Sequence, residues 1–150
     1  MAFQPPERIV ARAELLTVLG QWCHAAAPEE ACALLIGARH GVEWRLQQLW
    51  PCCNVWPDPF ERSHRFAIDP REQLQAQKWA RGRNLELLGA AHSHPTSAPL
   101  PSATDLALTA APALMLIWGS WQPDREPEPL VWWLEDPPAA PRQLEWRMER

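Results

Sequence analysis

The chain has 150 residues, of which 47% are hydrophobic and 21% are charged, and its formal net charge is −4. This composition is typical of one globular domain with a buried core, and it excludes a disordered chain. The acidic balance argues against a general nucleic-acid binder, which normally carries a basic face. No stretch reaches the roughly 18 continuous apolar residues of a membrane-spanning helix.

Two further features concern the compartment in which the protein folds. Residues 1–14 contain acids and prolines, and they lack the basic patch and apolar core of a signal peptide. The spacing of the four cysteines matches no zinc or redox motif; they are Cys23, Cys32, Cys52 and Cys53. We therefore expect free thiols in a reducing, cytoplasmic environment, with no membrane partner.

Apolar periodicity and turn residues predict mixed strands and helices along the chain. The clearest helix start is Asp69-Pro70, with an acid at the N-cap and proline at the first helical position. In chain order we expect an edge strand at 7–11, a helix at 12–26, strands at 31–36 and 42–53 joined by a turn at 39–41, a loop at 54–65, a strand at 65–68, a helix from 70 to about 81, a strand from 85 to the histidines described below, a helix at 103–111, a strand at 113–121, a turn at 123–129 and a strand at 130–135.

The end of the chain is less clear, because residues 143–148 fit either a final strand or a short helix. There is no internal repeat and no linker. The sequence thus predicts a single domain over residues 1–150, of the α/β (α+β) class, in which helices flank a curved, mostly antiparallel sheet.

The most informative stretch lies between residues 85 and 105. His92 and His94 are two residues apart on a predicted strand, so their side chains point to the same side and can converge on one ion. Asp105 is the third residue of a helix whose N-cap would be Ser102, which directs its carboxylate back toward the strand end. Two imidazoles and one carboxylate are ligands of the kind that a catalytic zinc takes, with a fourth position left for water.

The same residues allow a simpler interpretation. A serine followed three residues later by an acid is an ordinary helix N-terminus, and a His-x-His pair occurs often in loops. Likewise, Glu29 and Glu30 precede a strand, where carboxylates are usually solvated. From these fragments taken separately, a metal site and a plain helix start remain open alternatives.

Together, the fragments resemble a known signature. His92-Ser93-His94-Pro95, six further residues, Ser102, two residues and Asp105 form the pattern of the JAMM (JAB/MPN) zinc metallopeptidases. Residues 30–37 resemble the opening Glu-x-Cys-Gly-x-Leu-x-Gly of that family, with Glu30 at the position of its acid. One departure is Ala33, where the family usually has glycine. The segment from Asn54 to Pro70 also resembles the middle of the family pattern.

The resemblance implies a fold, a cofactor and a mechanism. His92, His94 and Asp105 would hold one Zn²⁺ per chain, and water would fill the open position. Glu30 would take a proton from that water and pass it to the departing amine. The hydroxyl of Ser102 would meet the oxyanion of the tetrahedral intermediate.

It also implies a substrate class. The chain is most similar to compact bacterial members, which act on ubiquitin-like (β-grasp) sulfur-carrier proteins and free their C-terminal Gly-Gly from an attached cysteine or trailing residues. We therefore expect such a carrier as the partner, in cysteine, thiamine or molybdopterin synthesis.

Three alternatives remain. A non-catalytic MPN-type scaffold or protein-interaction module would share the fold, although all five motif positions are intact. A DNA-repair relative with a His-x-His-Pro motif is disfavoured by the acidic balance. A metal-storing or metal-sensing module is disfavoured by an open site with a placed glutamate.

Overall fold

The structure is a computed structural model that describes residues 4–120, 129–136 and 139–150. The described residues form eight strands, three α-helices and one short 3-10 helix. In chain order they are β1 (Arg8–Arg12), α1 (Ala13–Ala26), β2 (Cys32–His40), β3 (Glu43–Cys52), η1 (Pro59–Glu61), α2 (Pro70–Arg81), β4 (Glu86–Ser93), α3 (Ala103–Leu108), β5 (Ala113–Trp118), β6 (Pro129–Leu134), β7 (Arg142–Gln143) and β8 (Glu145–Glu149).

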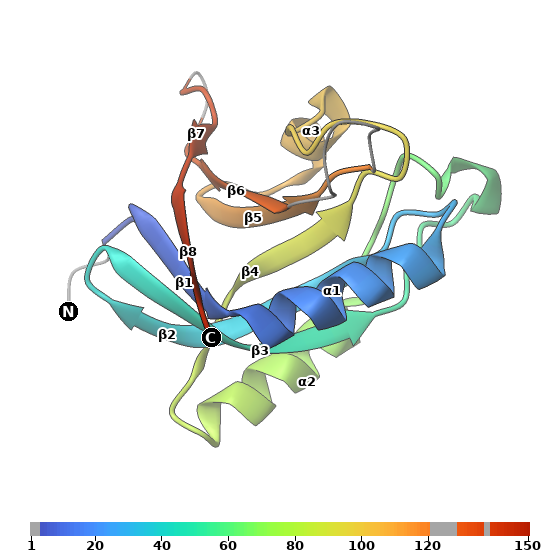
Figure 1. The fold of residues 1–150 in the computed structure, drawn as a ribbon. Coiled ribbons are helices and arrows are strands. Elements are labelled where there is room, and N and C mark those ends of the chain that lie inside the picture. The colour runs from blue at the N-terminus through green and yellow to red at the C-terminus, as the bar shows by residue number, and fades with distance from the viewer. Residues whose placement is uncertain (1–3, 121–128, 137–138) are drawn as a thin grey trace.

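All eight strands belong to one curved sheet of order β7-β6-β5-β4-β2-β3-β1-β8 (Figure 1). The pairs β2–β3, β2–β4, β5–β6 and β6–β7 are antiparallel. The pairs β1–β3, β1–β8 and β4–β5 are parallel. The predicted mixed fold with a mostly antiparallel sheet is therefore confirmed.

The C-terminal segment connects the two ends of this sheet. β7 and β8 are separated by Leu144 alone, yet β7 pairs with β6 at one edge and β8 pairs with β1 at the other. The Leu144 N–H donates to the carbonyl of Val131, and the next amide, that of Glu145, donates to the carbonyl of Glu7. Residues 142–149 therefore hold the two edges of the curve together.

Two helices cover opposite faces of the sheet (Figure 1). On the inner face, Leu19 and Cys23 of α1 belong to the main apolar core with Leu35 of β2. On the outer face, Ala76 and Ala80 of α2 pack in a second cluster with neighbouring residues of β2 and β3, namely Cys32, Leu34, Ile36 and Cys52. Residues of β2 thus alternate between the two clusters, as a strand buried on both faces requires.

The helix starts and turns follow local chemistry. The Asp69 carboxylate accepts the Arg71 N–H at 2.9 Å, and Pro70 occupies the first position of α2, as predicted. α2 ends at Gly82, and Asn84 (φ 57°) takes the left-handed conformation after it. At the predicted hairpin, β2 extends through His40 and the chain turns at Gly41, whose φ is +61°.

Four predictions about elements were wrong in detail. The first strand, β1, is not at an edge, because the C-terminal strand β8 pairs with it and forms the edge instead. The predicted helix 103–111 ends at Leu108, because Thr109 is extended (φ −96°, ψ 126°). In addition, Pro112 disfavours a helical backbone at the preceding residue, Ala111. Residues 65–68, predicted as a strand, belong to no helix or strand. The predicted strand 113–121 corresponds to β5, which ends at Trp118.

The open alternative at the end of the chain is decided in favour of a strand, β8. The predicted turn at 123–129 lies almost entirely outside the described residues. None of the helices in the described ranges has the length and apolarity that crossing a membrane requires.

Candidate metal centre

The two histidines and Asp105 converge at the end of β4. His92 lies in β4, His94 follows its last residue, and Asp105 comes from the first turn of α3. The Nε2 atoms of the histidines are 3.2 Å apart, and each lies 3.1 Å from Oδ2 of Asp105. All three side chains are buried, and His92 is only 1% exposed.

The helix cap and the site are the same piece of structure. The Ser102 Oγ accepts the Asp105 N–H at 3.0 Å, and Oδ2 of Asp105 accepts the Ser102 N–H at 3.0 Å. This reciprocal capping box starts α3. Because the box fixes the side chain of Asp105, it also directs the carboxylate toward the histidines. Capping and the predicted ligand role are therefore compatible.

A local hydrogen bond fixes which nitrogen of the His94 ring carries a proton. Its Nδ1 lies 2.8 Å from the carbonyl of Ala98, and a carbonyl can only accept. Nδ1 therefore carries a proton. In the neutral ring the lone pair of Nε2 is then free to bind a metal, and in the protonated ring the Nε2–H donates to Asp105. Such a bond to a carbonyl is the usual outer support of a metal-bound histidine.

His92 is held differently. Its ring stacks on Phe66 with 4.5 Å between ring centroids, and burial lowers its pKa. Burial alone would raise the pKa of Asp105, but the hydrogen bonds from His92 and His94 hold it well below its usual range. A neutral imidazole and an ionised carboxylate are the protonation states that metal ligands need.

The spacing of the three atoms fits a metal ion. A tetrahedral ion with ligand distances of about 2.0–2.1 Å keeps its ligand atoms about 3.3 Å apart. The separations of 3.1–3.2 Å between the two Nε2 atoms and Oδ2 are close to that value. The donor set of two nitrogens and one oxygen, already converged and buried, therefore fits a small divalent cation such as zinc.

Glu30 completes the group. One ligand atom from each of Glu30, His92, His94 and Asp105 lies within 4.8 Å of the other three. Glu30 is 2% exposed, and its Oε2 has no hydrogen-bond partner among the described residues. Burial raises the pKa of this carboxyl to about 8, a shift that His94 opposes and Asp105 reinforces.

A groove leads to this group across the outer face of the sheet. One cavity of about 470 Å³ lies between residues 65–68 and α3, and Asp105 forms part of its wall. A second cavity of about 330 Å³ reaches His92 and shares Phe66 and Ala90 with the first. The two cavities are therefore contiguous, and both end at the candidate metal ligands.

The other histidines lie apart from the group, as expected. His24 is on α1, His40 ends β2, and His64 is exposed in the loop after η1. The four cysteines are free thiols; burial raises the pKa of Cys23 to about 12. Sequence reasoning gave no role to Asn54, although the family pattern includes the segment that begins there.

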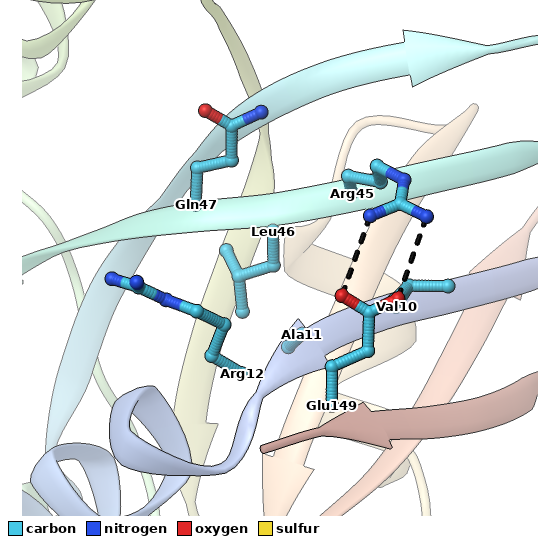
Figure 2. A pocket seen from close by; sticks show the side chains of 7 residues that line it. All are labelled: Val10, Ala11, Arg12, Arg45, Leu46, Gln47 and Glu149. Atoms are coloured by element: carbon cyan, nitrogen blue, oxygen red, sulfur yellow. Dashed lines mark hydrogen bonds and ion pairs between the residues drawn. The ribbon is translucent and has the colours of Figure 1, made fainter.

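A further hollow of about 350 Å³ lies elsewhere, on the outer face of β1, β3 and β8 (Figure 2). Arg45 spans it with two hydrogen bonds to Glu149, each 3.4 Å long, while Arg12 and Gln47 extend from neighbouring strands. None of its lining residues belongs to the candidate metal group.

Comparison with known proteins agrees with this geometry. A desampylase from Pyrococcus furiosus is 42% identical over 77 residues, which are 51% of this chain and 49% of that protein. The chain thus matches about half the length of this curated relative. A solution structure from Desulfitobacterium hafniense superposes with a TM-score of 0.83 at 29% identity, covering 95% of this chain and 93% of the other.

A second solution structure, of a protein from Salinibacter ruber, has a TM-score of 0.64 at 23% identity and covers 93% of this chain and 90% of the other, so it supports the fold alone. The family described as prokaryotic homologs of the JAB domain matches residues 12–135, a range that contains the capping box, both histidines and Glu30. The chain therefore belongs to this family of prokaryotic JAB-domain proteins.

Proposed function

We propose that this chain is a zinc-dependent metallopeptidase that cleaves after the C-terminal Gly-Gly of a ubiquitin-like (β-grasp) sulfur-carrier protein. We further propose that residues 1–150 form one catalytic domain. The observation that carries the proposal is the convergence of three ligand atoms beside the buried carboxylate of Glu30, one of whose oxygens has no hydrogen-bond partner among the described residues. A purely structural ion site does not need such an acid.

The proposed ligands are His92, His94 and Asp105, through the two Nε2 atoms and Oδ2. Zinc is the proposed metal because two imidazoles and one carboxylate are its common catalytic set. When bound, it supplies an acidified water and polarises the scissile carbonyl. The capping box and the Ala98 carbonyl keep Asp105 and His94 in their ligating orientations.

Glu30 is the proposed general base and acid. Its pKa near 8 lies close to neutral pH, so the carboxyl can both accept and return a proton during turnover. It takes the proton from the attacking water as the water oxygen bonds to the carbonyl carbon. It then delivers that proton to the nitrogen of the departing amine as the C–N bond breaks, so the carboxylate is regenerated.

Ser102 is the proposed oxyanion donor. Its Oγ already accepts the Asp105 N–H, so the hydroxyl proton is the part of the side chain that remains to be donated. Because the cap fixes Oγ at the helix start, the hydroxyl is held in place before the substrate binds. A preorganised donor of this kind stabilises the charge that develops on the carbonyl oxygen.

The groove supports an extended, small-residue substrate tail. The Ala67 carbonyl accepts the Val55 N–H, and the Ala67 N–H donates to Asn54, so both backbone groups face the loop. No hydrogen bond of the described residues uses the backbone N–H or C=O of Phe66 or Ile68. We propose that residues 65–68 run extended, as their sequence predicts; these groups then point the opposite way from those of Ala67, toward the groove, where a Gly-Gly tail would pair as an added strand.

A cleavage assay tests the proposal. Small β-grasp proteins of the host that end in Gly-Gly, extended by cysteine or by a few residues, are incubated with the full chain and analysed by mass spectrometry. We expect release of the extension, its loss with a chelator and its recovery on addition of zinc. The control is Glu30→Gln, which should bind zinc without cleaving. Zinc binding without cleavage of any carrier would refute the substrate class, and failure to bind zinc would refute the enzyme.

A further inference from the structure

Glu30 lies outside every helix and strand of the described residues. It falls between Ala26, the last residue of α1, and Cys32, the first residue of β2. A sheet therefore does not fix its backbone. The reaction nevertheless requires its carboxylate to stay beside the metal ligands, so other contacts must hold it there.

Four hydrogen bonds at Glu30 and Ala31 provide this restraint, and one of them is the backbone bond from the Ser93 N–H to the Ala31 carbonyl at 3.0 Å. The Glu30 N–H donates to the carbonyl of Arg62 at 2.7 Å. The Glu30 carbonyl accepts from Nδ2 of Asn54 at 3.1 Å. The next amide, that of Ala31, donates to Oγ of Ser93 at 2.8 Å. Two of the four bonds are made by side chains, those of Asn54 and Ser93, which mutation can remove singly.

Ser93 connects Glu30 to the strand that carries the histidines. Side chains alternate along β4, so Ser93 points to the face opposite His92 and His94. Its Oγ is buried and accepts the Ala31 N–H, one residue after Glu30. The hydroxyl of the serine between the two histidines therefore adds a side-chain bond to the backbone bond between the Ser93 N–H and the Ala31 carbonyl, and both hold the glutamate segment against their strand.

Asn54 connects Glu30 to the groove. Its Nδ2 also donates to the Arg65 carbonyl at 2.9 Å, and its Oδ1 accepts the N–H groups of Trp56 and Ala67 at 3.1 and 3.3 Å. All four hydrogen-bonding positions of the amide are thus used. One side chain holds both the backbone of Glu30 and the segment 65–68 that forms the groove edge.

We propose that Ser93 and Asn54 are positioning residues: Ser93 holds the Glu30 segment without touching the substrate groove, whereas Asn54 holds Glu30 and the groove together. This inference rests on the proposed function, because it assigns Glu30 the proton-transfer role. The inference predicts that the two variants affect different steps of the reaction, which a general loss of stability would not produce. Removing Ser93 changes the chemical step, and removing Asn54 changes both the chemical step and the binding of the substrate.

The first test is Ser93→Ala in the full, zinc-loaded chain, with the extended carrier as substrate. We expect kcat to fall by about 10- to 100-fold with KM unchanged, since the acid–base group is misplaced while the groove is intact. Ser93→Thr, which keeps the hydroxyl, should recover most of the loss. Ser63→Ala is the matched control, because the Ser63 side chain is exposed and its hydroxyl hydrogen-bonds to the ring of its neighbour His64 at 3.2 Å.

The second test is Asn54→Ala, for which kcat should fall and KM should rise. A readout independent of activity is amide hydrogen exchange followed by NMR. In the unmodified chain the amides of Ala31 and Ala67 should exchange slowly although neither lies in a strand. Ser93→Ala should speed exchange at Ala31 alone, and Asn54→Ala at Ala67. Zinc content should stay at one ion per chain in both variants.

Either of two results would overturn the inference while leaving the proposed function intact: an active wild-type chain whose Ser93→Ala variant keeps its kcat, or a Ser93→Ala variant that raises KM without lowering kcat. Unchanged exchange at Ala31 in Ser93→Ala would show that the hydrogen bond does not hold the segment, and would overturn it also. A zinc-loaded wild-type chain that cleaves no carrier would instead refute the proposed function.

Discussion

Ser102 and Asp105 bond each other twice, each accepting the backbone N–H of the other with its side-chain oxygen at 3.0 Å. The same Asp105 oxygen lies 3.1 Å from Nε2 of both His92 and His94. The start of a six-residue helix is therefore built into the candidate metal centre. A substitution that alters the helix cap should therefore also alter the candidate metal centre.

Replacing Ser102 tests this link. Ser102→Ala should cost about 1 kcal/mol of folding stability through the lost cap, and it should lower kcat by about 10²–10³-fold through the lost hydroxyl donor. Urea unfolding and steady-state kinetics measure the two effects. Ser102→Thr keeps both the cap and the hydroxyl and serves as control. A Ser102→Ala variant with wild-type kcat would exclude the oxyanion role.

Substitutions of Glu30 and His94 should have different effects on metal binding and turnover. Glu30→Gln keeps the three proposed ligands and removes the base, so we expect one zinc per chain and no turnover. His94→Ala removes a ligand and should lose both zinc and turnover. Elemental analysis after gel filtration, with the cleavage assay on the same samples, distinguishes the two variants. Retained turnover in Glu30→Gln would contradict the assigned mechanism.

Ala33, the departure from the family pattern, is buried and pairs with Ala91 of β4 and Pro51 of β3. Strand alternation places its methyl on the inner face, with Leu35, and His92 lies on the outer face. Ala33→Gly should therefore lower stability by about 0.5–1 kcal/mol without changing kcat. Thermal unfolding and kinetics check this, and a marked change in kcat would show that the methyl does reach the site.

The sequence predicted those parts that depend on neighbouring residues. Asp69 before Pro70 predicted the start of α2, and the two-residue spacing of His92 and His94 predicted their shared side of the strand. It could not predict that the first strand lies one position inside the edge of the sheet, because its outer partner is a strand at the far end of the chain, where Arg8 pairs with Glu145. Nor could it predict that Asn54 joins the backbone of Glu30 to residues 65–67.

The sequence did not predict the hydrogen bonds of Asn54 because its four partners come from separate segments, and no local sequence pattern indicates such contacts. The family resemblance placed Asn54 within a matching segment but assigned it no contact. A side chain that joins distant pieces of backbone is visible only in the fold. Such residues are therefore the ones for which the structure adds most to the sequence motif.

The raised pKa of Glu30 predicts a pH effect on stability in the metal-free protein. Burial raises the pKa from 4.5 to about 8, so between these values the folded state binds this proton more than the unfolded state does. The stabilisation from this group is complete below pH 4.5 and is lost as pH rises through 8. His94, whose pKa is also raised against the effect of burial by its hydrogen bond to Asp105, acts in the same direction.

Comparison with Glu30→Gln isolates the glutamate, because glutamine does not titrate. The free energy of unfolding of the wild-type chain, relative to the variant, should fall by a few kcal/mol between about pH 5 and about pH 8, since each pKa unit corresponds to about 1.4 kcal/mol. Urea unfolding of chelator-treated protein at both pH values measures it. A difference that rises with pH would mean that the fold stabilises the ionised form and lowers the pKa of Glu30, and its carboxylate would then be a weaker base toward the attacking water.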